Sequence, residues 1–186
     1  LDKLRQHKDS VVKQLTGGLT ALSKKRKVEV IRGVGKFETP HSLIVDKNGE
    51  TMRVKFKKAI IAVGSRVIKL PFLPDDDRIV DSTGALELRF IPKKMLIIGG
   101  GIIGMEMASV YASLGAEITI VEMGDQVMPA ADKDLVQPLL KFCKNEYEHI
   151  YLKTRVTGVK AQKNGLLVSF DGDQAPDKEQ KYDMIL

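Results

Sequence analysis

Residues 95–123 read MLIIGGGIIGMEMASVYASLGAEITIVEM, and the succession of patterns in this stretch indicates the architecture of the chain. An apolar run typical of a buried strand opens it, and helix-spaced apolar residues follow from about Ile102 to Leu114. Gly115 then stands where glycine commonly ends a helix. A second apolar run closes the stretch at Glu122. Strand, helix and strand in direct succession predict a βαβ unit with parallel strands.

Three glycines, Gly99, Gly101 and Gly104, lie between the first strand and the helix. The spacing GxGxxG, after a strand and at the start of a helix within a βαβ unit, is the dinucleotide-binding pattern. Gly99 would permit the tight turn, Gly101 would leave room for a pyrophosphate, and Gly104 would let the helix pack closely on the strands. The N–H groups near Ile102 and Ile103 would meet the phosphates at the positive end of the helix dipole. We therefore predict a dinucleotide site; the alternative is a purely structural turn.

Two glutamates bear on the choice of ligand. Glu122 ends the second strand at the distance where a dinucleotide site places its ribose-binding acid. Its carboxylate can accept hydrogen bonds from both ribose hydroxyls and would repel a 2′-phosphate, so we predict NAD rather than NADP. Glu106 lies in the first turn of the predicted helix among apolar residues. It either stabilises the helix dipole or reaches the nicotinamide end of the cofactor, and the sequence alone does not separate these readings.

The other elements follow from local patterns. A long amphipathic helix is predicted from about Leu1 to Leu22, and Asn48-Gly49 between two β-rich runs predicts a hairpin. The continuously apolar AIIAV, residues 59–63, is expected to be a strand buried on both faces. A short helix follows, capped by Asp81 or Ser82.

The pattern continues beyond Glu122. A second helix is expected from Asp132 to about Tyr147, and the strand at 150–153 would complete a βαβαβ unit. Three further β-rich runs, at 154–162, 165–170 and 181–186, predict a meander.

Composition excludes several kinds of chemistry. The chain has 186 residues, a net charge of +6 and one cysteine, Cys143. A single cysteine excludes an internal disulfide, a dithiol redox pair and a cysteine-rich zinc site, and its helix-spaced apolar neighbours predict a buried thiol. We expect no metal site, no catalytic side chain, no nucleic-acid partner and no membrane span. The charged first residues do not resemble a signal peptide, and we expect a cytoplasmic protein.

GGGIIGMEMASVYASLGAEITIVEM, DQVMPAADKD and AVGSR…LPFLP resemble the flavin-dependent pyridine nucleotide–disulfide oxidoreductases. QLTGGL, GVGKF and DSTGALEL agree with the subgroup that reoxidises protein-bound dihydrolipoamide, and the resemblance covers nearly the whole chain. It implies two cofactors, NAD and FAD, and a relay in which a cysteine pair reduces FAD and the flavin reduces NAD⁺. It also implies a homodimeric parent and, as partners, the lipoyl domains of 2-oxo acid dehydrogenase complexes.

The resemblance also assigns residues to the cofactors. Residues 93–186 would be the NAD domain, and residues 1–92 the preceding part of the FAD domain, with a boundary near Pro92. The implied NAD contacts are Gly99, Gly100, Gly101, Ile102, Ile103, Gly104, Glu106, Glu122 and Val156. The implied FAD contacts are Gly35, Val63, Gly64 and Ser65. The resemblance thus favours the nicotinamide reading of Glu106. Val63 replaces the usual Thr or Ala, a small departure because that contact is mostly through backbone.

The family's relay needs parts that this sequence does not contain: an N-terminal glycine motif for the FAD pyrophosphate, a redox cysteine pair and a His–Glu pair from a C-terminal dimer domain. We expect the chain to be the central part of a longer oxidoreductase and to be inactive by itself. The alternatives are another FAD-dependent disulfide reductase, an NADH oxidase, or a non-catalytic NAD-binding module. The predicted fold class is α/β, with a Rossmann-like NAD-binding domain built on a parallel sheet and a β-meander, plus an incomplete FAD-binding domain.

Overall fold

The computed structural model describes all 186 residues, and their contacts divide the chain into two compact units. Residues 2–66 form the N-terminal unit and residues 67–186 the C-terminal unit. The boundary predicted near Pro92 is a different one, because it separates the segment assigned to the FAD domain from the segment assigned to the NAD domain. It stays a prediction.

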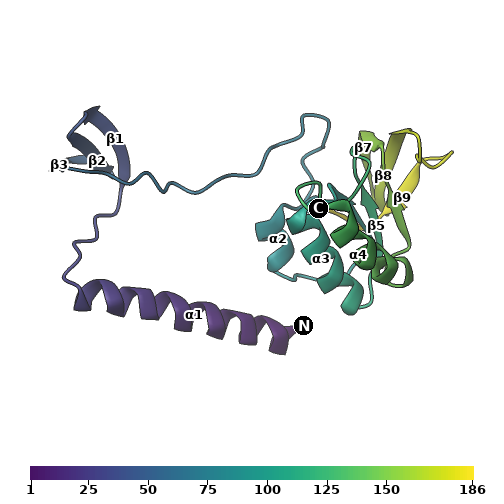
Figure 1. Cartoon of the computed structure of the whole chain (residues 1–186), viewed down its shortest axis with the longest axis horizontal. Coiled ribbons are helices and arrows are strands. Elements are labelled where there is room, and N and C mark those ends of the chain that lie inside the picture. Colours follow the sequence, from purple (N-terminus) through teal and green to yellow (C-terminus); the bar gives the residue numbers. More distant parts are fainter. The chain divides into compact units, whose positions relative to one another are not determined.

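The N-terminal unit contains one helix and one antiparallel sheet (Figure 1). The predicted helix is present as α1 (Asp2–Lys25), which runs without interruption through Gly17 and Gly18 and buries none of its residues. The sheet has the order β1-β2-β3, with β1 (Val34–Thr39), β2 (Ser42–Lys47) and β3 (Glu50–Lys55).

The predicted hairpin joins β2 to β3. Asn48 and Gly49 both have positive φ, 55° and 91°, as the tight turn that matches strand twist requires. The carboxylate of Asp46 accepts a hydrogen bond from the Gly49 N–H at 2.9 Å, which holds the turn closed. The hairpin prediction is confirmed.

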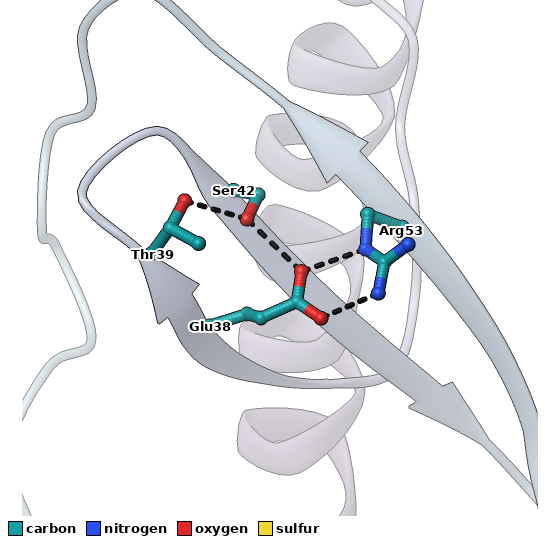
Figure 2. A network of polar contacts seen from close by, with 4 residues as sticks. All are labelled: Glu38, Thr39, Ser42 and Arg53. Carbon is teal, nitrogen blue, oxygen red and sulfur yellow. Dashed lines mark hydrogen bonds and ion pairs between the residues drawn. The ribbon is translucent and has the colours of Figure 1, made fainter.

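A polar network ties the strands of this sheet together (Figure 2). Glu38 on β1 accepts hydrogen bonds from Arg53 Nε on β3 at 2.6 Å and from the Ser42 hydroxyl on β2 at 3.0 Å. The hydroxyls of Ser42 and Thr39 lie 2.7 Å apart. The guanidinium of Arg53 lowers the pKa of Glu38. Because this pair is solvent-exposed, it contributes little to stability.

The expected buried strand at 59–63 is absent. These residues have no regular structure, and Ile60 and Val63 are 94% and 89% exposed. A strand buried on both faces needs neighbours that bond its backbone on both sides and cover its side chains. No other strand of the chain pairs with this segment, so its apolar pattern is not sufficient to form a strand here.

The C-terminal unit has three layers (Figure 1). A parallel sheet lies in the middle, with helices on one face and an antiparallel meander on the other. The strands of the parallel sheet, in spatial order, are β10 (Met184–Ile185), β4 (Lys94–Ile98), β5 (Glu117–Val121) and β6 (His149–Tyr151). The helices are α2 (Ser82–Leu86), α3 (Ile102–Ser113) and α4 (Lys133–Glu146). The meander consists of β7 (Thr154–Gln162), β8 (Gly165–Gly172) and β9 (Gln180–Tyr182).

The central strands bury side chains on both faces. On β4, Met95 and Ile97 belong to the core beneath the helices, whereas Leu96 between them belongs to the core shared with the meander. Successive strand residues point to opposite faces, so a continuously apolar strand supplies two cores at once. Cys143 of α4 lies fully buried in the helix-side core, as expected.

The structure resolves two details at the edges of this unit. Asp81 is the N-cap of α2, and its carboxylate accepts a hydrogen bond from the Gly84 N–H at 2.9 Å. The run 181–186, expected as one meander strand, is divided at Asp183 into the end of β9 and the separate strand β10. Asp183 exchanges hydrogen bonds with the backbone of Lys94, both at 2.9 Å, and this contact directs the chain from the meander into the parallel sheet.

No helix in the structure combines the length and the apolar character needed to cross a membrane.

Candidate dinucleotide site

The glycine turn connects β4 to α3, as the sequence predicts. Gly99 has φ of +111°, a conformation that side chains rarely allow. Its N–H donates to the carbonyl of Val121 at 2.8 Å, which holds the start of the turn beside the end of β5. The turn therefore opens at the carboxyl ends of the parallel strands, where ligands bind in open α/β sheets.

Gly101 and Gly104 have opposite surroundings. A Cβ atom placed on Gly101 would meet no atom within 4 Å, so the protein leaves open space there. A Cβ atom on Gly104 would lie 2.1 Å from the carbonyl oxygen of Gly99, far inside contact distance. The open space at Gly101 is what room for a pyrophosphate requires, and the crowding at Gly104 is what close packing of the helix on the strand requires.

The start of α3 offers backbone donors to a ligand. Gly101 is the N-cap and supplies no side-chain cap, and the first N–H groups of a helix have no partner within the helix. Ile102 and Ile103 in this first turn are both exposed. Together with the helix dipole, these donors favour an anion, and a pyrophosphate fits this end of the helix.

Glu122 faces the glycine turn from the end of β5. One carboxylate oxygen accepts a hydrogen bond from the Gly100 N–H at 2.8 Å, and the other accepts one from the Gly124 N–H at 2.7 Å. The side chain is half-buried. Each oxygen keeps capacity for a second hydrogen bond, so the carboxylate is fixed in place and can still receive two hydroxyls.

The loop from Glu122 to Ala131, called the 122–131 loop below, lies against the glycine turn. The Met128 N–H donates to the carbonyl of Gly100 at 2.7 Å, and the fully buried Val127 packs beside Gly100. Sequence reasoning missed Val127. The only signal for it is that Val127 and Met128 are apolar residues directly after the polar stretch GDQ, which does not reveal what Val127 contacts.

Glu106 lies farther along α3 than predicted. The helix begins at Ile102, so Glu106 is in the second turn, and the first turn contains no acidic residue. The side chain is exposed. Because the dipole effect falls off within the first turn, the dipole reading of Glu106 loses its basis.

Val156, the remaining predicted NAD contact, is on β7 and is buried in the core shared with Val121 of β5. A bulge between Val156 and Gly158 interrupts the pairing of β7 with β8 at this point. The side chain of Val156 is thus used for packing, which leaves its backbone for any contact with a ligand.

The predicted FAD contacts lie in the N-terminal unit. Gly35 is on the exposed strand β1, and Val63, Gly64 and Ser65 are exposed residues without regular structure. Glycine turns at the start of a helix hold the pyrophosphate of a dinucleotide, and these residues form no such cradle. They do not by themselves fit FAD.

The chain is similar in sequence to known oxidoreductases. The pyridine nucleotide-disulphide oxidoreductase family matches residues 2–186. The whole chain is 51% identical over 187 residues to a dihydrolipoyl dehydrogenase of Vibrio parahaemolyticus, of which it covers 39%. It is 42% identical over 168 residues to the mitochondrial dihydrolipoyl dehydrogenase 2 of Arabidopsis thaliana, covering 89% of the chain and 33% of that protein. The chain thus spans well under half the length of these relatives.

Solved structures agree with this comparison. The HOCl-induced flavoprotein disulfide reductase RclA from Escherichia coli superposes with a TM-score of 0.83 and 27% identity, over 99% of this chain and 41% of that one. LpdA from Mycobacterium tuberculosis gives a TM-score of 0.85 at 22% identity, again over 99% of this chain and 41% of that one. The second likeness shows the fold alone.

Proposed function

Because the chain belongs to the pyridine nucleotide-disulphide oxidoreductase family, we propose that it is the central part of a dihydrolipoyl dehydrogenase. The whole protein would reoxidise protein-bound dihydrolipoamide through a disulfide and FAD and reduce NAD⁺ to NADH. Residues 93–186 would be its NAD-binding domain and residues 1–92 part of its FAD-binding domain. The 51% identity to a protein of that name supports this reading over another flavoprotein disulfide reductase, since the identity to RclA is only 27%.

The observation that carries the NAD assignment is the pairing of an open glycine turn with a fixed carboxylate. The space above Gly101 and the free N–H groups of Ile102 and Ile103 would receive the pyrophosphate. Glu122, held by two backbone N–H groups, would accept the hydroxyls of the adenosine ribose. A 2′-phosphate would bring negative charge against this carboxylate, so the site favours NAD over NADP.

The remaining NAD contacts follow along the same face. Glu106, exposed one helical turn beyond the pyrophosphate end of α3, would reach toward the nicotinamide, and Val156 would contact the cofactor through its backbone. NAD, when bound, supplies the carbon that accepts a hydride. The residues of this chain bind and orient it, and none of them takes part in a chemical step.

The FAD contacts, partners and assembly of the whole protein are also proposals. The similarity to dihydrolipoyl dehydrogenases supports FAD contacts at Gly35, Val63, Gly64 and Ser65, with the rest of the cradle supplied by other parts of the protein. On the same similarity, lipoyl domains of 2-oxo acid dehydrogenase complexes are the proposed partners. A cytoplasmic homodimer is the proposed assembly of the whole protein.

Calorimetric titration of the 186-residue chain with NADH and with NADPH tests the proposal. We expect NADH to bind more tightly, and Gly101→Val to abolish binding because its side chain would occupy the pyrophosphate space. Since that space is empty in the protein, the variant should fold normally. Equal affinity for the two nucleotides would refute the role of Glu122, and unchanged affinity in Gly101→Val would refute the site itself.

A further inference from the structure

Gly100 of the glycine turn makes three contacts with the 122–131 loop. Its N–H donates to the Glu122 carboxylate at 2.8 Å, and its carbonyl accepts the Met128 N–H at 2.7 Å. Its third contact is with Val127. Glu122, Val127 and Met128 all belong to the 122–131 loop. The three contacts therefore hold this loop against a single residue of the turn, Gly100.

The contact between Gly100 and Val127 has no spare room. A Cβ atom on Gly100 would lie 2.9 Å from Val127 Cγ1 and 3.3 Å from Glu122 Cβ, both closer than ordinary van der Waals contact. Val127 is fully buried, and a branched side chain has few alternative rotamers. Any enlargement at Gly100 must therefore displace the 122–131 loop, and with it Glu122.

This contact lies between the two groups that would bind the dinucleotide. The glycine turn would hold the pyrophosphate and Glu122 the adenosine ribose, and in a dinucleotide these two parts are covalently joined. Both contacts are made at once only if the turn and the carboxylate are correctly spaced, and binding constellations tolerate errors of only about 0.5 Å.

We propose that Val127 is a positioning residue of the dinucleotide site: by packing on Gly100 it sets the spacing between the glycine turn and the Glu122 carboxylate. This inference rests on the proposed NAD-binding function and adds a residue that does not touch the ligand. A purely structural Val127 would affect the stability of the unit and leave the affinity of the folded protein for NADH unchanged.

Neighbouring glycines provide the test, because a Cβ on Gly100 would be crowded by Val127, whereas a Cβ on Gly101 would meet no atom within 4 Å. Calorimetric titration with NADH is carried out on the full chain as wild type, Gly100→Ala, Val127→Ala and the double variant. One extra methyl group against a packed side chain should weaken binding by Gly100→Ala about tenfold. Val127→Ala should also weaken binding, because the loop loses its support. The double variant should recover most of the wild-type affinity, since the new methyl group occupies space that the smaller side chain vacates.

A parallel set separates this effect from direct obstruction. Gly101→Ala should weaken binding by meeting the ligand itself, and Val127→Ala should not restore it. Gly17→Ala is the matched control, since a Cβ there also meets no atom within 4 Å and Gly17 lies on α1 of the N-terminal unit. It should bind NADH like the wild type. Tyrosine fluorescence confirms that each variant is folded under the conditions of the titration.

The outcomes are distinct. Rescue of Gly100→Ala but not of Gly101→Ala supports the positioning role. A folded Val127→Ala with wild-type affinity overturns it while leaving NAD binding intact, and so does a double variant no better than Gly100→Ala. Absence of NADH binding by the wild type overturns the proposed function and this inference together.

Discussion

Gly104→Ala tests the close approach of α3 to β4 on which the glycine turn depends. The added Cβ would lie 2.1 Å from the Gly99 carbonyl oxygen, whereas ordinary contact begins at 3.4 Å, so the helix start would have to retreat by 3.4 − 2.1 = 1.3 Å. Retreat is opposed by Met105, the next residue along α3, which is buried in the core beneath the helices. The obstacle is backbone, which cannot rotate away as a side chain can.

The expected magnitude combines two opposing effects. Overpacking costs about 1–3 kcal/mol, and contact with backbone places this site at the upper end of that range. Alanine is the better helix former by about 1 kcal/mol. We therefore expect the free energy of unfolding to fall by about 2 kcal/mol, and we expect NADH affinity to fall as the N–H groups of the first turn shift.

Urea unfolding followed by tyrosine fluorescence measures this change in the relevant unit. The chain has four tyrosines and no tryptophan, and Tyr111, Tyr147, Tyr151 and Tyr182 all lie in the C-terminal unit. The tyrosine signal therefore reports unfolding of the C-terminal unit only and is insensitive to unfolding of residues 2–66. Gly101→Ala is the control: it meets no atom within 4 Å and should cost less than about 1 kcal/mol, the usual effect at a helix N-cap. If Gly104→Ala were as stable as this control, the close-approach argument would be wrong.

Three further predictions concern other parts of the C-terminal unit. Glu122→Arg should shift the ratio of NADPH to NADH affinity by about 1.5–3 kcal/mol toward NADPH, because a charged donor replaces a repelling carboxylate; an unchanged ratio in calorimetry would show that Glu122 points elsewhere. Tyr111→Phe should cost about 1–3 kcal/mol in urea unfolding, because the buried hydroxyl donates to the Ala85 carbonyl at 2.7 Å; a change near zero would mean that water replaces the lost donor. Hydrogen bonds from Arg78 lower the pKa of Asp76 from 3.8 to about 2. Because the folded pKa is the lower one, this contribution to stability is complete above about pH 4 and is lost as pH falls toward 2. Asp76→Asn should therefore lose less stability than the wild type over that window, and parallel curves would exclude the pair as a source of acid sensitivity.

Elements that depend on short-range chemistry could be read from the sequence. The turn at Asn48-Gly49, the cap at Asp81 and the strand–glycine–helix succession after Met95 each depend on a few neighbouring residues, and all appear in the structure. The burial of Cys143 followed from helical periodicity. In each case the deciding interaction spans a few positions, so the local pattern contains it.

Tertiary structure alone decided the features that depend on contacts between segments far apart in the sequence. The apolar run 59–63 looks like a buried strand, but strand formation depends on partners, and none pairs with it. The division of the last run at Asp183 depends on Lys94, which is far away in sequence. The same holds within the candidate site. The GxGxxG spacing predicts the turn, but the crowding of Gly100 by Val127 arises because the 122–131 loop folds back onto it. Periodicity shows which face of an element is apolar, and only the assembled layers show which atoms that face must meet.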